Sequence, residues 1–389
     1  MPGFEIFGEE ERAAVNAWWD INNGVMFAHG FDGLRKGVFK VRDFERAMAG
    51  AMGAPHALAV SSGSAALLVA LRALGIKRGD EVITQAFTFV ATVEAIIESG
   101  ATPVMTEVDD SFNMDPDDLI KRITPRTKLV VPVHMAGAPA DMDRILSICN
   151  ERGIPVLEDA AQAVGGSFRG KALGTLGIAG TYSFDFAKNL TTGEGGMVIT
   201  NSEDVFLAAR AYHDHGHEYN SKFPRGKDTR SLPGFNFRMT EVQAVLGLVQ
   251  LGKLDFILAK HRENKAALKA ALADLNLTYR RLHDADGDTA DTLIFVLPTA
   301  AAAAEVAKGL GERGIGTKNL PDALTWHFAG TWQHLFHDFP SLANADRLWP
   351  RTTDLLTRAI ALPVTIKMTA DDIARVAAGL RATLQGVPA

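Results

Sequence analysis

The chain has 389 residues, of which 47% are hydrophobic and 22% charged, and its formal net charge is −6. This length can bury a large core, and the mild acidity without a basic cluster argues against nucleic-acid binding. A single cysteine, Cys149, cannot form an internal disulfide. The acidic N-terminal stretch lacks signal-peptide features, and we find no apolar run of the about 20 residues that a membrane helix needs. We therefore expect a cytoplasmic globular protein.

Seven short apolar segments in the first two-thirds of the chain are predicted as β-strands. They lie at residues 57–60, 81–84, 102–105, 129–133, 154–157, 181–184 and 197–200. Segments with helical periodicity separate several of them, for example at 64–74 and 89–98, which is typical of a mostly parallel sheet covered by helices. The strand at 197–200 follows its predecessor too closely for a helical crossover, so we expect it to run antiparallel.

The character of the sequence changes near residue 252. A long amphipathic helix is predicted at 254–275, followed by a strand at 292–296, a helix at 302–313 and a closing helix at 371–384. We therefore expect a large unit at 1–252 and a smaller α+β unit at 253–389. The first forty or so residues show no strand pattern of their own.

Lys188 is the first candidate for a chemical role, because it lies between a predicted strand and a glycine-rich turn. A partly desolvated lysine amine has a lowered pKa and can form a Schiff base with an aldehyde. Upstream, Asp159 follows the predicted strand at 154–157. Pyridoxal phosphate (PLP) needs such an amine, and a carboxylate that keeps its ring nitrogen protonated. Asp159 alone has a simpler interpretation as the cap of the next helix.

The turn at residues 61–66 is a candidate phosphate-binding site. It closes a strand and opens a helix, so backbone N–H groups and the helix dipole would favour an anion, and Gly63 permits close approach. An ordinary turn capped by serine is the simpler interpretation. Ser183, on a nearby predicted strand, is a second candidate phosphate contact. Gln162 could reach a phenolate oxygen and Phe89 could stack on a pyridine ring, although phenylalanine usually packs in a core.

A long polar loop at 213–230 contains three histidines, His213, His215 and His217. Their alternate spacing would place them on one face only in an extended chain, and no cysteine or carboxylate cluster completes a metal site. We therefore expect no metal. Long polar loops are often lids or binding loops, so we interpret this one as facing a substrate.

Seven segments, in the same order along the chain, resemble one family, the DegT/DnrJ/StrS sugar aminotransferases. They are residues 61–67, 87–92, 132–137, 158–162, 183–188, 192–196 and 234–241. Each is weak alone, but the ordered set is specific and covers nearly the whole chain. The resemblance implies an α/β protein of PLP-dependent transferase fold type I, which is aspartate aminotransferase-like. A large domain with a mostly parallel seven-stranded sheet would be followed by a smaller C-terminal α+β domain.

The resemblance also implies a role for each matching residue. Lys188 would form the Schiff base with PLP, and Asp159 would pair with the pyridinium nitrogen. The ring would be contacted by Gln162 and Phe89, and the phosphate by Gly63, Ser64, the Ala65 backbone, Ser183 and Asn236 of a neighbouring subunit. Hence the active site would be shared across a homodimer. Ser64 stands where the family usually has threonine, which keeps the hydroxyl group.

The implied reaction moves an amino group from an amino acid, usually glutamate in this family, to a ketone or aldehyde of a sugar. Residues 1–8, 30–36 and 214–217 look most like transaminases that make 8-amino-3,8-dideoxy-manno-octulosonate (8-amino-Kdo) for bacterial lipopolysaccharide. An acidic sugar needs cationic or hydrogen-bonding partners. The candidates are Arg35, Lys36, His215, His217, Arg225 and Arg230. Alternative acceptors are a nucleotide-4-keto-6-deoxysugar and a cyclitol.

Three other interpretations fit the same segments less well. A sugar 3-dehydratase of this fold would carry histidine in place of Lys188. A cysteine desulfurase would carry its cysteine on a mobile loop, whereas Cys149 lies in a predicted helical stretch. A non-catalytic regulator would not need Lys188, Asp159 and Gln162 together, and function is argued from such sites rather than from a fold.

Overall fold

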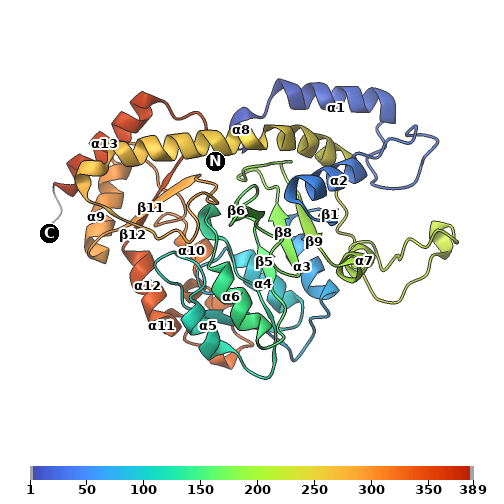
Figure 1. Ribbon diagram of the computed structural model, residues 1–389, viewed down its shortest axis with the longest axis horizontal. Helices are drawn as coiled ribbons and strands as arrows, with labels where there is room; N and C mark the ends of the chain where they lie inside the picture. Colours follow the sequence, from blue (N-terminus) through green and yellow to red (C-terminus); the bar gives the residue numbers. More distant parts are fainter. Residues whose placement is uncertain (1–2, 386–389) are drawn as a thin grey trace.

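A computed structural model describes residues 3–385, which form a large unit built on a sheet and a smaller C-terminal unit (Figure 1). The chain begins with a 3-10 helix, η1 (Gly3–Ile6), and the helices α1 (Glu9–Asn22) and α2 (Lys40–Met52). No strand occurs in residues 3–40, as the sequence predicts.

The large unit contains the seven expected strands, in the order β1-β9-β8-β5-β4-β2-β3. Their bounds are β1 (His56–Val60), β2 (Glu81–Gln85), β3 (Thr102–Thr106), β4 (Thr127–Val130), β5 (Leu157–Asp159), β8 (Ala179–Ser183) and β9 (Gly196–Thr200). Ladder hydrogen bonds hold β1-β9-β8-β5 and β3-β2-β4, and parallel bridges from Val130 to Val156 and from Val133 to Asp159 join the two sections. β9 runs antiparallel to both β1 and β8, which confirms that prediction.

Alternate residues of the strands enter two different cores, because successive side chains of a strand point to opposite faces. Ala57 and Ala59 of β1 belong to one core, while Leu58 and Val60 belong to the other. On the second face α3 (Gly63–Ala73) packs between α4 (Val90–Glu98) and α7 (Glu203–Tyr212). The sheet is therefore covered on both sides, as a mostly parallel sheet requires.

The remaining elements of the large unit are short. They are the helices α5 (Pro116–Arg122) and α6 (Met142–Asn150), the 3-10 turns η2 (Met135–Gly137) and η3 (Arg225–Lys227), and a hairpin of β6 (Ser167–Phe168) and β7 (Lys171–Ala172). The sequence pattern predicts neither strand of this hairpin, because two-residue strands show no alternation.

Helix α8 (Glu241–Ala271) runs alongside both units and is longer than predicted. Thr240 caps it, with the Gln243 side chain returning to the Thr240 backbone in a capping box. Residue 252, the predicted domain boundary, lies inside this continuous helix. By length and composition alone α8 would pass as a membrane span, contrary to our expectation, but core helices pass the same test. It packs against α1 and α2 on one side and α13 (Ala370–Leu384) on the other.

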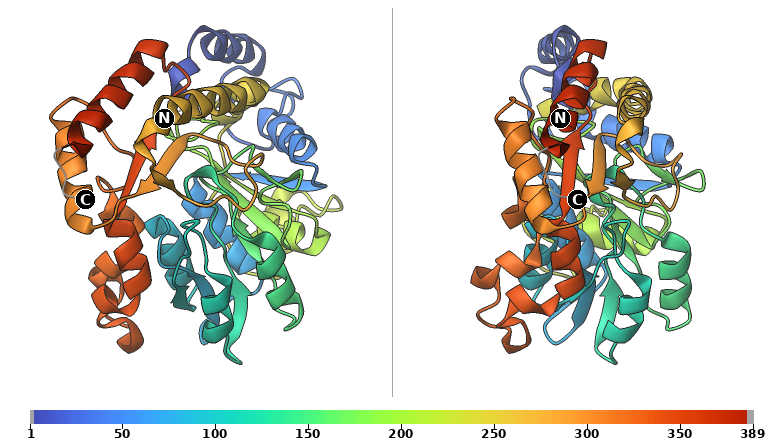
Figure 2. Two further views of the ribbon diagram at one scale, coloured as in Figure 1. Left: turned by 60° about the vertical axis from the view of Figure 1, so that its left-hand side comes forward. Right: turned by 90° about the vertical axis from the view of Figure 1, so that its left-hand side faces the viewer.

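The smaller unit is an antiparallel three-stranded sheet with helices beside it (Figure 2). Its strands are β10 (Thr278–Tyr279), β11 (Thr292–Val296) and β12 (Ala359–Pro363), with α9 (Ala300–Gly311) and α13 beside them. The region between α9 and β12 contains α10 (Leu324–His327), α11 (Ala345–Leu348), α12 (Pro350–Thr357) and the turns η5 (Ala329–Thr331), η6 (Gln333–Leu335) and η7 (Pro340–Leu342); η4 (Ala273–Leu275) follows α8. Of these, β11, α9 and α13 are close to prediction.

Candidate active site

A cavity of about 310 Å³ opens where the carboxyl ends of β1, β5 and β8 meet. β1 and β8 are both antiparallel to β9, and β5 is parallel to β8, so these three strands end at the same edge. Ligands in open α/β sheets bind outside such ends. Both units line the cavity, which includes Asp159, Lys188 and Ser183 from the large unit and Asp291, Lys318, Asn319 and His327 from the smaller one.

Lys188 follows β8 in a turn closed by its own backbone N–H, which donates to the Asp185 carbonyl at 3.0 Å. Burial lowers the pKa of the Lys188 amine, while the charges of Asp185 and Asp159 oppose that shift. Lys318 lowers the Lys188 pKa further. An amine with a lowered pKa has more of its unprotonated, nucleophilic form near neutral pH.

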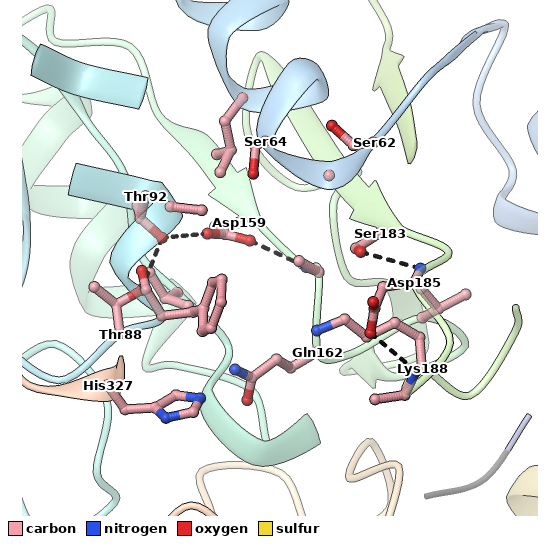
Figure 3. A pocket seen from close by; sticks show the side chains of 18 of the residues that line it. Ser62, Ser64, Thr88, Thr92, Asp159, Gln162, Ser183, Asp185, Lys188 and His327 are labelled. Carbon is pink, nitrogen blue, oxygen red and sulfur yellow. Dashed lines mark hydrogen bonds between the residues drawn. The ribbon is translucent and has the colours of Figure 1, made fainter. Parts of the chain in front are cut away.

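Asp159 ends β5 and is only 3% exposed. Its Oδ1 accepts a hydrogen bond from the Ala161 N–H at 3.1 Å, and its Oδ2 accepts one from the Thr92 hydroxyl at 2.7 Å (Figure 3). Burial raises the pKa of the Asp159 carboxyl, and these hydrogen bonds only partly offset it. The ionised form therefore needs a nearby cation, which a protonated ring nitrogen would provide.

At the predicted phosphate end of the site, the start of α3 lies in close contact with β8. A Cβ atom at Gly63 would lie 2.7 Å from Cβ of Ser183, so only glycine lets the start of α3 approach β8 this closely. Ser62 caps α3 by accepting a hydrogen bond from the Ala65 N–H at 3.1 Å. Ser62, Gly63, Ser64 and Ser183 all line the cavity. Ala65 lies just outside it.

Gln162 and Phe89 also line the cavity. The Gln162 Oε1 accepts a hydrogen bond from the Ala136 N–H at 3.0 Å, which fixes the amide and leaves its NH2 group for a ligand. Phe89 is 39% exposed and stacks with Trp326 at a centroid distance of 6.2 Å. The contact of these two side chains with a cofactor ring stays a prediction.

The predicted substrate residues lie elsewhere. None of His215, His217 and Arg230 lines the cavity. The histidine at 217 is buried against Asp228, with 3.3 Å between Nδ1 and Oδ2, so its expected contact with substrate does not fit this structure. The other two are exposed, as is Asn236. A role for these exposed side chains at an active site requires a second chain.

Two of the arginines predicted to bind an acidic sugar instead form ion pairs with carboxylates of the same chain. Arg35 is fully buried and pairs with Glu241 at 2.8 Å. Arg225 donates two hydrogen bonds of 2.7 Å to the buried Asp214. Neither guanidinium is available to a substrate in the cavity.

Several residues of the cavity are absent from the sequence-based prediction. Thr88 and Thr92 belong to the family-like segment 87–92 and lie one helical turn apart, a spacing that could have indicated them. Lys318 and His327 lie in a region without any predicted element. Burial lowers the pKa of His327 to about 4, and its Nδ1 donates to the Ala323 carbonyl at 2.8 Å. Its Nε2 therefore remains as an acceptor.

No group of three or more potential metal ligands occurs within residues 3–385. Two histidines of the polar loop have other partners, His217 in Asp228 and His213 in the Arg210 carbonyl. His213 Nδ1 contacts the Arg210 carbonyl at 2.5 Å, and burial lowers its pKa to about 4.

Residues 32–381 match the model of the DegT/DnrJ/EryC1/StrS aminotransferase family. The chain belongs to this family of sugar aminotransferases. It is therefore an enzyme, which rules out the non-catalytic interpretation, and its fold is the expected PLP-dependent fold type I. Enzymes of the family use PLP, and solved structures with the same fold contain it in its PLP or pyridoxamine phosphate form.

Two relatives and one solved structure illustrate the similarity. SpsC of Bacillus subtilis, a spore coat polysaccharide biosynthesis protein, is 36% identical over 361 residues, which cover 89% of this chain and 90% of SpsC. GDP-perosamine synthase of Caulobacter vibrioides is 44% identical over 220 residues, covering 56% of this chain and 57% of that protein. An aminotransferase from Psychrobacter cryohalolentis, 29% identical, superimposes with a TM-score of 0.85 over 98% of both chains.

Proposed function

We propose that this aminotransferase transfers the amino group of an amino acid, glutamate by analogy with the family, to a carbonyl carbon of an acidic sugar. The acceptor that we favour is 8-oxo-3,8-dideoxy-manno-octulosonate, in cytoplasmic synthesis of a bacterial surface polysaccharide. The observation that carries this proposal is that Lys188, Asp159 and a second lysine, Lys318, all line one cavity.

Residues that line the cavity would supply most of the contacts that we propose for PLP. The turn from Ser62 to Ser64, with Ser183, would hold the phosphate at the positive end of α3. Asp159 would hold the ring nitrogen, and Phe89 would cover the ring face. When bound, PLP supplies an electron sink for the substrate carbon. The Lys188 amine would hold the cofactor aldehyde and, once released, would carry a proton on Nζ between substrate and cofactor carbons.

Lys318 is the structural reason for favouring an acidic acceptor. Its Nζ lies 2.6 Å from Oδ2 of Asp291, a carboxylate whose Oδ1 also accepts a hydrogen bond from the Thr292 hydroxyl at 2.8 Å. An ammonium group has three donors, and the Asp291 contact uses one of them. Lys188 would be committed to the cofactor, so Lys318 is the remaining lysine of the cavity wall for a substrate carboxylate. His327 Nε2 adds an acceptor for a sugar hydroxyl.

A nucleotide-linked keto-sugar is the second candidate acceptor, because the 220-residue match to GDP-perosamine synthase reaches 44% identity. A cavity of about 310 Å³ is at the lower end for ligand sites, so cofactor and one sugar ring would fill it. The nucleotide would then have to lie outside the cavity, against the protein surface around the cavity entrance or against another subunit.

We also propose that the enzyme is a homodimer with shared active sites. Asn236 is exposed in a single chain. The resemblance of residues 234–241 to the family implies that Asn236 contacts the cofactor phosphate of a neighbouring subunit. A neighbouring subunit would bring this side chain to the phosphate group.

The test is a spectrum of the PLP-loaded protein, taken before and after glutamate and then after each candidate acceptor. Glutamate should bleach the visible cofactor band, and the 8-oxo octulosonate should restore it. Restoration only by a nucleotide-linked keto-sugar would replace the acceptor and keep the transaminase. A Lys188→Ala variant with normal turnover would contradict the assignment of the cofactor lysine.

A further inference from the structure

The segment η1 lies directly against the turn that carries Lys188. The Gly3 N–H donates a hydrogen bond of 2.9 Å to the carbonyl oxygen of Lys188 itself. The next residue, Phe4, stacks on Phe186 with ring centroids 4.5 Å apart and an interplanar angle of 19°. Gly3 and Phe4 therefore both contact the turn that carries Lys188, Gly3 through its backbone and Phe4 through its side chain.

The backbone of Gly3 is packed closely against the turn that carries Lys188. A Cβ atom at Gly3 would lie 2.6 Å from the Lys188 carbonyl oxygen and 3.0 Å from Cγ2 of Thr191. Distances below 3.0 Å force one of the two groups to move. The backbone of η1 and the backbone of the lysine turn are consequently fixed relative to each other.

The rest of η1 is attached to the smaller unit and to α8. Oε2 of Glu5 accepts hydrogen bonds from the N–H groups of Ile366 at 2.8 Å and Lys367 at 3.1 Å, just after β12. The Ile6 carbonyl accepts one from Lys253 of α8 at 3.0 Å. Figure 1 shows the start of the chain beside α8, near the junction of the two units. Thus η1 joins the lysine turn to the unit that supplies Lys318.

We propose that residues 3–6 form a positioning element that fixes the Lys188 backbone, and through it the direction of the reactive amine. The carbonyl that Gly3 binds is bonded to Cα of Lys188, so this hydrogen bond restrains the backbone next to the carbon atom that bears the reactive side chain. Phe186 is 52% exposed, and the Phe4 ring stacks on it from η1. Small misplacements of a reacting group are costly in rate.

Phe4→Ala is the main test, because it removes the stacking contact and leaves every backbone donor in place. Phe7→Ala, the same change at a 41% exposed position one turn later, is the matched control, and Phe4→Tyr should restore the ring contact. Three quantities are compared with the parent enzyme: PLP affinity of the apoprotein, kcat, and the pH midpoint of the visible cofactor band.

The proposal expects Phe4→Ala to lower PLP affinity and kcat about tenfold and to shift the pH midpoint, because the amine is misdirected. Phe7→Ala and Phe4→Tyr should match the parent. Gly3→Ala, which pushes on the Lys188 carbonyl directly, should repeat the Phe4→Ala result in a folded protein. A Phe4→Ala protein that melts at lower temperature but keeps the parent's pH midpoint and PLP affinity would overturn the proposal.

The inference rests on Lys188 being the cofactor lysine, and that assumption is tested separately. Lys188→Ala should lose the pH-dependent band altogether. If Lys188→Ala keeps the band, the proposed function fails. If Lys188→Ala loses the band while the Phe4 and Gly3 variants behave like the parent enzyme, the proposed function stands and the positioning role of residues 3–6 fails.

Discussion

The Thr92 hydroxyl donates a hydrogen bond of 2.7 Å to Oδ2 of Asp159. The Thr88 hydroxyl lies 2.8 Å from that of Thr92, and since Thr92 spends its only proton on the carboxylate, Thr88 is the donor of this pair. Thr88, just before α4, and Thr92, in its first turn, thus form a chain of two hydroxyl groups that ends at the carboxylate that would hold the cofactor nitrogen. The hydrogen bond from Thr92 also lowers the Asp159 pKa against the effect of burial.

Thr92→Val should weaken cofactor binding, because valine has the same shape and no donor. A hydrogen bond to a charged group contributes about 1.5–3 kcal/mol, so PLP affinity should fall by roughly tenfold or more. Thr92→Ser keeps the hydroxyl and should stay near the parent. Spectroscopic titration of the apoproteins with PLP measures both values. Equal affinities for the valine and serine variants would show that Asp159 does not depend on this donor.

Gly63→Ala should weaken binding of the cofactor phosphate specifically. The added Cβ would sit 2.7 Å from Cβ of Ser183 and 2.9 Å from its Oγ, so the turn must move away from β8. Affinity for PLP should fall by an order of magnitude, whereas affinity for pyridoxal, which has no phosphate, should change little. Gly252→Ala, in open space on α8, serves as the control. An equal loss for both ligands would point to general disruption of the site.

The strand ends that form this site were predictable because their signals are local. Short apolar runs place Asp159 and Ser183 at strand ends, and parallel strands bring their ends to one edge. Lys188 follows from the same pattern. Thr92 was within reach of the same reasoning, since it lies one helical turn after Thr88 in a family-like segment.

The small-unit wall of the cavity was not predictable in that way. Lys318 is an isolated lysine whose N–H donates a hydrogen bond of 2.8 Å to the Ala361 carbonyl of β12. β12 is a short apolar strand that ends in Pro363 and has no alternation to reveal it. The predicted start of α8 was late for a related reason. Its first half is apolar and its second half is rich in lysine, so one continuous helix has two different patterns.

Lys318→Met should move the pH midpoint of PLP association to higher pH. The charge of Lys318 lowers the Lys188 pKa, so its removal raises that pKa and reduces the unprotonated amine at a given pH. The charge of Asp291 acts in the opposite direction, so Asp291→Asn should move the midpoint to lower pH. Stopped-flow association of PLP with each apoprotein across pH gives the midpoints. Shifts of the same sign in both variants would contradict this electrostatic coupling.

Asn236→Ala should weaken PLP binding if a second subunit contributes this side chain. Asn236 is exposed and outside the cavity of its own chain, so within one chain its removal should have no effect on the cofactor. The expected loss is about 1 kcal/mol, typical of one hydrogen bond. Asn344→Ala, at another exposed asparagine, is the control. PLP affinity and sedimentation velocity are measured together, and unaltered affinity in a dimer would exclude this residue from the site.

Asp214→Asn should destabilise the protein strongly, because Asp214 is the buried centre of the polar loop. Its carboxylate accepts two hydrogen bonds of 2.7 Å from Arg225 and one of 2.6 Å from Tyr219, and it lies 3.1 Å from Nε2 of His29. These partners hold the Asp214 pKa well below its usual range despite burial. Removing one member of a buried charged network costs about 3 kcal/mol, measurable by urea unfolding at pH 7.

The matched control is Asp110→Asn, at a side chain that is 67% exposed and pairs with Arg281 at 2.6 Å. Exposed ion pairs contribute less than about 1 kcal/mol, so this variant should unfold near the parent. The difference between the variants should shrink on acidification. The pKa of Asp214 is held below its usual range, so the stability that its carboxylate contributes is present above the unfolded-state pKa of about 3.9 and is lost as the pH falls below it. Equal unfolding free energies for the two variants at pH 7 would show that the Asp214 network does not stabilise the loop.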